Sequence, residues 1–450
     1  MIGLINISLL YIIFDHFENK KNNLMNIVYS ISIIYFIYLI SFLLFGFVYK
    51  NLKFLILITL IFSVLKISNS KILKKALSIF VVLYVIYFIY SQTITATTTT
   101  DSIAYFYFES IYSKAKINNL FLDNRSLTLY ILISVFDDPI IKPIDFLIPF
   151  LNFKILFLVL IQFKMHIKNT FVYIFLMVSP VLIFNLNYTN SHFLTGVFTY
   201  IVYEQISNNK LEKKYEYLKL LSLFSFLYFL RIEGLILVAV LIGWKKVMNK
   251  NENNKDIVVL YVLSIILYCF VWLRILNISP IENSNWGVRH FSTILIYALF
   301  SLLAIFLVGI LKKLIKYNKI LKIVYFLIGV IFLFAQFNFL NYNGKYINNE
   351  YSFWGVTLLV FAYMLFVERN RKNSENFLVL LLISIWFGFV LIIFVNNNYL
   401  DLFNVNWKFV SNSSNICARQ DIASFCNRSL VQYVIPSFLI LLNKIQDNVE

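Results

Sequence analysis

The sequence predicts an all-α protein, a polytopic transmembrane helix bundle of about 12–14 spans. Hydrophobic residues make up 60% of the 450 residues and charged residues only 14%, whereas about a quarter of a soluble domain is charged. The apolar residues form runs whose length is close to the roughly 20 residues that a helix needs to cross a bilayer. The basic residues fall in short clusters between these runs, which is the pattern of cytoplasmic loops in membrane proteins.

The first element is expected in residues 1–25, as a short helix or an interfacial anchor. Its apolar stretch precedes Lys20 and Lys21, whereas a secretory signal peptide carries its positive charge before the apolar region. The remaining apolar runs predict spans at 26–48, 53–70, 74–91, 146–163, 169–187, 190–206, 214–230, 232–247, 256–276, 290–311, 319–340, 353–368 and 376–396, with a shorter one at 430–443.

Basic clusters orient these spans, because cytoplasmic loops are rich in Lys and Arg. The clusters assigned to the cytoplasmic side lie in 18–25, 71–75, 164–168, 208–217, 245–255, 312–322 and 369–372. Lys50 and Lys53 are the one basic pair on the other side. The net charge of +17 is therefore spread over loops, which indicates anionic lipid headgroups and not nucleic acid as its partner.

The orientation places the long loop 92–145 outside. Two half-apolar stretches in it, 104–113 and 126–136, are too short to span and predict helices on the membrane surface. Residues 26–312 are expected to form the membrane core. Residues 313–450 would add variable C-terminal helices and the outer loop 397–429, where Cys417 and Cys426 form either a disulfide or two free thiols.

Asp101 is the acidic residue with the clearest position, at the end of a Thr run near the start of loop 92–145. It is either a catalytic base on the outer face or a solvated loop acid beside interfacial aromatic residues. Tyr105 and Glu109 follow it as candidate substrate contacts. Asp137 and Asp138 precede Pro139, where they either contact substrate or end a helix in a turn.

Two outer corners carry cations. Arg231 and Glu233 stand between two apolar runs, and since residues two apart do not face each other on a straight helix, we expect a break near Gly234 or separate partners. Arg289 and His290 open a later span, where they either bind a phosphate or anchor the helix at the headgroups. The polar hairpin 185–192 is either part of a sugar site or a simple turn.

The order of these features resembles the GT-C superfamily of integral membrane glycosyltransferases over roughly residues 75–310. The matching segments, in chain order, are Thr100-Asp101-Ser102 in the first outer loop, Ser179-Pro180 before a polar outer turn, Arg231-Ile232-Glu233-Gly234 at a corner, and Gly287-Val288-Arg289-His290-Phe291 at the start of a span. The loop has one Asp where the family has an acidic pair, and no large soluble C-terminal domain follows.

The resemblance implies transfer of a sugar from a polyprenyl-phosphate donor to an envelope glycan, lipid or protein, with inversion, on the outer face of a bacterial plasma membrane. It implies that Asp101 is the base and that Arg289, His290 and Arg231 hold the donor phosphate. The alternatives are an O-antigen-type polymerase and a lipid-linked glycan flippase or transporter. No dedicated metal cage is expected around a lone Asp, and a need for a divalent cation stays open.

Overall fold

The computed structural model describes residues 2–18, 25–46, 51–67, 70–93, 127–136, 147–162, 186, 191–208, 214–231, 233–248, 255–278, 295, 298–299, 301–306, 308, 435–436 and 439–440. Throughout these ranges the regular structure is helical and contains no strand. The prediction of an all-α chain is confirmed for this part. The predicted helix 104–113 and the predicted spans 319–340, 353–368 and 376–396 lie outside the described residues, and of the predicted span 169–187 only residue 186 is described.

The helices begin and end within a few residues of the predicted spans. Their bounds are α1 (Ile2–Glu18), α2 (Met25–Phe45), α3 (Leu52–Ile67), α4 (Ser70–Thr93), α6 (Leu127–Phe136), α7 (Leu147–Gln162), α10 (His192–Asn208), α11 (Lys214–Leu230), α12 (Glu233–Met248) and α13 (Lys255–Ile278). Within the described ranges, two of them contain segments long and apolar enough to cross a membrane, Met25–Phe45 and Asp256–Ile275.

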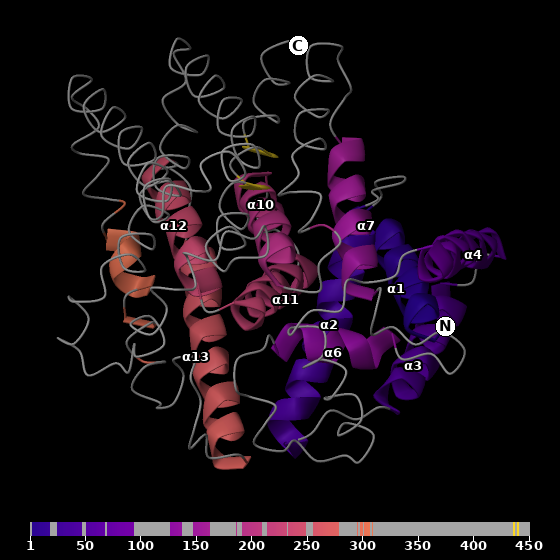
Figure 1. Ribbon diagram of the computed structural model, residues 1–450, viewed down its shortest axis with the longest axis horizontal. Helices are drawn as coiled ribbons and strands as arrows, with labels where there is room; N and C mark the ends of the chain where they lie inside the picture. Colours follow the sequence, from indigo (N-terminus) through magenta and orange to yellow (C-terminus); the bar gives the residue numbers. More distant parts are fainter. Residues whose placement is uncertain are drawn as a thin grey trace, which may run out of the picture.

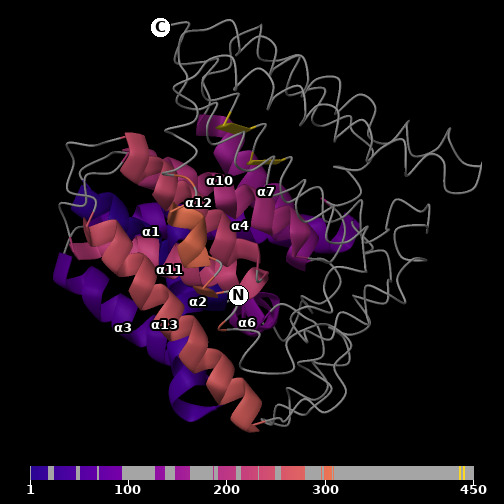
Figure 2. The same cartoon turned by 90° about the vertical axis from the view of Figure 1, so that its left-hand side faces the viewer.

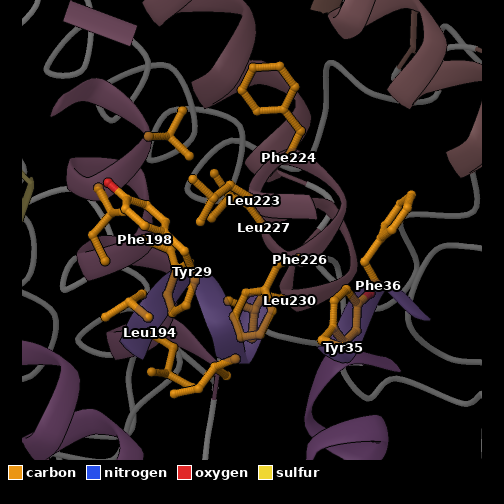
Figure 3. Packing of buried hydrophobic residues seen from close by; sticks show 14 of the residues in the cluster. Tyr29, Tyr35, Phe36, Leu194, Phe198, Leu223, Phe224, Phe226, Leu227 and Leu230 are labelled. Atoms are coloured by element: carbon orange, nitrogen blue, oxygen red, sulfur yellow. The ribbon is translucent and has the colours of Figure 1, made fainter. Parts of the chain in front are cut away.

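Helices α2, α10 and α11 form the interior of the packed helices (Figures 1 and 2). The rings of Phe198 and Phe226 stack with centroids 4.1 Å apart, and Tyr35 meets Phe226 edge-on at 5.0 Å. Figure 3 shows these rings among the packed residues of the core, which also include Leu194 and Tyr29. Such pairs add to area burial only in offset or edge-on geometry, so they fix how deeply α10 and α2 sit against α11.

Hydrogen bonds along the α2–α11 contact define its register. Asn26 accepts from Lys219 at 3.5 Å, the Ser32 and Ser222 hydroxyls are 3.2 Å apart, and Tyr35 donates to the Ser225 carbonyl at 3.5 Å. Residue numbers rise together along the two helices, so α2 and α11 run parallel. Helix α10 runs antiparallel to α11, because His192 and Phe198 contact Arg231 and Phe226 in the reverse order.

Lys219 anchors the end of this contact where α2 and α11 begin. Its side chain is only 2% exposed, and its ammonium lies 4.7 Å from the ring centroids of Phe14 and Tyr29 and 5.1 Å from that of Tyr215. A desolvated ammonium over aromatic faces is attracted by the ring quadrupoles. The three rings come from α1, α2 and the first turn of α11, so Lys219 links these three helices.

Helix α6 lies across α2 and α11 and does not extend their direction (Figure 1). Thr128 donates to the Phe226 carbonyl at 3.0 Å, and the described side chains of α6 are buried. The helix predicted at 126–136 is therefore present. Its described side chains are buried against two central helices, whereas a helix lying on the membrane surface would expose one side. At its other end Val135 meets Gly3, where an added Cβ would lie 2.3 Å from the Val135 carbonyl oxygen.

Helices α3, α4 and α13 expose apolar faces. Their exposed large hydrophobic residues are Phe54, Leu55, Ile58, Ile61, Phe62 and Leu65 on α3, Leu77, Val81, Val82, Val85, Phe88 and Ile89 on α4, and Val259, Val262, Leu263, Ile266 and Phe270 on α13. Soluble monomers rarely expose contiguous apolar surface on this scale. These three faces agree with contact to an apolar environment.

The hydrogen bond between Tyr29 and Gln205 is expected to couple α2 to α10. The buried Tyr29 hydroxyl donates to Gln205 Oε1 at 2.7 Å. In a double-mutant cycle, Tyr29→Phe and Gln205→Leu should show a coupling free energy of about 0.6–1.7 kcal/mol, the range for interhelical hydrogen bonds in membrane proteins. Thermal unfolding in detergent measures it, and strictly additive losses would contradict the coupling.

Candidate functional site

The corner between α11 and α12 holds Arg231 in a fixed backbone position. Helix α11 ends at Leu230, and the chain enters α12 at Glu233. The Arg231 amide donates to the Leu227 carbonyl at 3.2 Å, and the Gly234 amide donates to the Arg231 carbonyl at 3.0 Å. An added Cβ on Gly234 would lie 2.5 Å from the Leu227 oxygen, so only glycine lets α12 approach α11 this closely.

His192 begins α10 at the same end of the packed helices. The preceding Ser191 is buried, and its carbonyl accepts from the Thr195 amide at 2.9 Å and from the Thr195 hydroxyl at 2.7 Å. These bonds close the first turn of α10 and fix the backbone that carries His192. The His192 side chain is 3% exposed, so it points into the protein.

Arg231 and His192 form the contact that defines the candidate site. Arg231 Nη1 lies 3.1 Å from His192 Nε2. A guanidinium is always protonated and only donates, so Nε2 must accept. The imidazole in this pair is therefore neutral, with its proton on Nδ1. The pair carries a net charge of about +1, contributed by Arg231.

The surroundings of this pair favour an anion. Helix α10 begins at His192, and α12 begins at Glu233, two residues after Arg231. The amino ends of helices carry a partial positive charge and unpaired amide groups. Two such ends and a guanidinium together form a suitable environment for a phosphate. Glu233 places one acidic residue in the same corner.

A second guanidinium lies near the far end of α13. Tyr268 packs on Phe229 with ring centroids 5.0 Å apart, which brings α13 beside the last turn of α11. Arg274 follows Tyr268 by six residues, a rise of about 9 Å along the helix. Its Nε atom is buried and has no hydrogen-bond partner among the residues that the structure describes.

Of the residues predicted for the site, the structure places Arg231 and shows that Glu233 opens α12. The interruption that was expected between the two spans is present at Arg231, and Arg231 contacts His192 as a separate partner, which was one of the two alternatives. The other predicted site residues lie outside the described ranges: Asp101, Tyr105, Glu109, Asp137, Asp138, Arg289 and His290. The same holds for Cys417 and Cys426.

His192 is absent from the predicted site. His192 stood in a polar hairpin for which a simple turn was the favoured interpretation. The predicted orientation could have indicated His192, because hairpin 185–192 and the corner at Arg231 were both assigned to the outer side. Among the described residues, no group of three or more His, Cys, Asp or Glu side chains is placed to hold a metal ion.

Comparisons with protein-family models, with curated proteins and with solved structures find no match to this chain. The chemistry must therefore be read from the site. A buried neutral imidazole against a guanidinium, beside two helix amino ends, offers donors for a phosphate and one basic nitrogen.

Proposed function

We propose that this protein is an integral membrane glycosyltransferase of the GT-C kind. It moves a sugar from a polyprenyl-phosphate donor to an envelope glycan, lipid or protein acceptor on the extracytoplasmic face, with inversion. The observation that carries the proposal is the contact between Arg231 and His192 at 3.1 Å. It joins two polar segments that the sequence assigns to the outer side, where the loop with Asp101 is also expected.

The lengths of the helices and their exposed apolar faces support the proposed location in the membrane. The two segments Met25–Phe45 and Asp256–Ile275 are long enough to cross. Helices α10 and α11, of 17 residues each, rise about 26 Å, close to the roughly 30 Å of the hydrocarbon core. The apolar faces of α3, α4 and α13 would contact lipid chains, whereas the buried hydrogen bonds between α2, α10 and α11 stay inside the protein.

The relative directions of the helices support the proposed orientation. Alternating spans require α2 and α11 to run outward and α10 to run inward. Helices α2 and α11 are parallel to each other and α10 is antiparallel to α11. In this orientation Lys219 lies at the cytoplasmic ends, and Arg231 and His192 lie at the outer ends. The phosphate-binding corner and Asp101 would then share one side of the membrane.

In the proposed reaction, the acceptor hydroxyl attacks the anomeric carbon from the face opposite the phosphate. A carbon–oxygen bond to the acceptor forms while the bond to the phosphate oxygen breaks, and its electron pair stays on the phosphate. Asp101 takes the hydroxyl proton. Arg231, with Arg289 and His290 as the resemblance implies, stabilises the leaving phosphate. Tyr105, Glu109, Asp137, Asp138 and Glu233 are the residues proposed to contact substrate.

Removal of the Arg231 charge tests the proposal. Arg231→Gln is expected to lower sugar transfer at least tenfold, since charge-assisted contacts to a phosphate contribute about 1.5–3 kcal/mol. Arg231→Lys should recover part of it, because a lysine keeps the charge without the planar fork. The assay follows radiolabelled sugar from polyprenyl-phosphate donors to membrane acceptors.

The matched control is Lys66→Gln, which removes a cation from the last turn of α3, far along the chain from the corner. It should leave transfer unchanged. Full transfer by Arg231→Gln at normal stability would remove the corner from the reaction. A wild-type protein that binds polyprenyl-phosphate sugars but transfers none would favour a flippase or a polymerase.

A further inference from the structure

We propose that α1 is a complete membrane span whose amino end, at Ile2, lies on the outer side together with the Arg231 corner. The sequence predicts either a short helix or an interfacial anchor over residues 1–25. The inference rests on the membrane location and orientation of the proposed function, but it does not depend on sugar transfer. It adds a span that runs inward ahead of α2.

Helix α1 is enclosed by other helices. It packs against α2, α3, α4 and α6, and none of its residues from Ile2 to Asp15 is exposed. The polar side chains of Asn6 and Ser8 are each only 1% exposed. A helix that lies in the membrane interface keeps a polar face in water, whereas α1 is covered on every side before His16.

The carboxyl end of α1 lies where α2 and α11 begin. The centroid of the Phe14 ring is 4.7 Å from the Lys219 ammonium. That ammonium also lies 4.7 Å from the ring centroid of Tyr29, in the second turn of α2, and 5.1 Å from that of Tyr215, in the first turn of α11. The segment that joins α1 to α2 holds a basic cluster assigned to the cytoplasm. Phe14 therefore marks the cytoplasmic end of α1.

The amino end of α1 meets the start of α3. The Asn6 side-chain amide donates to the Lys53 carbonyl at 2.9 Å, and Lys53 is the second residue of α3. Residues 46–51 join α2 to α3, so α3 starts close to the end of α2, away from the end where Phe14 lies. Helix α1 therefore runs antiparallel to α2, and Asn6 lies on the side assigned to Lys53, which is the outer side.

A second contact of the amino end does not involve α3. Gly3 packs so closely on Val135, near the end of α6, that a Cβ would overlap the Val135 carbonyl. The adjacent Phe136 ring lies 6.4 Å from that of Tyr87 on α4, and Tyr87 meets Phe150 on α7 edge-on at 5.1 Å. Tyr87 is six residues before the end of α4, and Phe150 is in the first turn of α7. Both positions are toward the outer side in the proposed orientation.

The length and the charges of α1 agree with a span. Its 17 residues rise about 26 Å, close to the roughly 30 Å of the hydrocarbon core. Its two acidic residues, Asp15 and Glu18, lie in the last turn, at the end assigned to the cytoplasm, and the part before Asp15 carries no charge. Charged side chains are costly in the middle of a bilayer, and α1 has none there.

Cysteine labelling with a membrane-impermeant maleimide tests the inference. The full-length chain carries Cys269, Cys417 and Cys426 replaced by serine, and single cysteines are then added one at a time. One stands in a short uncharged Gly-Ser extension ahead of Met1. The others are Phe17→Cys at the opposite end of α1, where Phe17 is 56% exposed, and Gln92→Cys at the exposed outer end of α4.

In intact cells the extension is expected to react as fully as Gln92→Cys, whereas Phe17→Cys should react only after permeabilisation. An interfacial anchor would keep both ends of α1 on one side of the membrane. Labelling of the extension and Phe17→Cys from the same side would therefore overturn the proposal. Labelling of the extension and Gln92→Cys from opposite sides would overturn it as well.

A protease site placed in the same extension repeats the test with the native cysteines present, so a cysteine-free chain that fails to fold leaves the test decisive. Protease added to intact cells should remove the extension. Cleavage only after permeabilisation would place the amino end of α1 in the cytoplasm and reject the inference.

The sugar-transfer assay separates this inference from the proposed function. The expected labelling of α1 in a protein that transfers no sugar would retain the span and reject the glycosyltransferase. Sugar transfer by a protein with both ends of α1 on one side would reject the span and leave the glycosyltransferase in place.

Discussion

Asp101→Asn is expected to lower sugar transfer by a factor of about one hundred or more, the typical contribution of a general base. The substitution keeps the size and hydrogen-bonding capacity of the side chain but removes its ability to accept the acceptor's proton. The rate of the chemical step should therefore fall while donor affinity changes little. Single-turnover transfer of radiolabelled sugar, with donor binding measured in parallel, checks this result.

Asp256→Asn is the matched control for Asp101→Asn. Asp256 lies in the first turn of α13 and accepts a hydrogen bond from Tyr217 at 2.8 Å, at the end assigned to the cytoplasm. The same chemical change there should leave transfer intact. If Asp101→Asn transfers sugar at the wild-type rate, Asp101 is not the base, and Asp137, Asp138 and Glu233 become the candidates.

The helices of the described ranges were largely predictable from the sequence, because each one coincides with an apolar run. The run at 26–48 became α2, and the run at 256–276 became α13, each with ends shifted by one to three residues. Helix ends depend on local backbone bonds that apolar patterning does not encode. The break at Arg231 between two apolar runs could therefore be predicted, although the hydrogen bonds that form the corner could not.

The site could be predicted only in part, because it forms between residues distant in sequence. His192 and Arg231 are separated by 39 positions, and neither segment alone specifies which helices pack together. Buried contacts such as that between Phe198 and Phe226 determine which helices pack together. These contacts depend on side-chain shape more than on hydrophobicity. Composition biased toward Phe and Tyr makes such contacts hard to single out in advance.

Gly234→Val is expected to lower stability strongly. An added Cβ at this position would lie 2.5 Å from the Leu227 oxygen and 2.9 Å from its carbonyl carbon. Backbone atoms cannot rotate away, so α12 would have to move from α11. Overpacking of this kind costs about 1–3 kcal/mol, or more where the backbone must shift. We expect a clearly lower Tm in detergent and poor accumulation in the membrane.

Gly243→Ala on the same helix provides the graded comparison. Its added Cβ would meet the Val308 side chain at 3.0 Å and the Ile305 Cα atom at 3.3 Å, contacts that smaller shifts relieve. Its Tm should fall less than that of Gly234→Ala.

Because Leu227 lies one turn before Arg231, a displaced corner should also separate Arg231 from His192. Gly234→Ala should therefore lose transfer beyond its loss of folded protein. A variant with normal Tm and normal transfer would contradict the tight corner on which the proposed phosphate site depends.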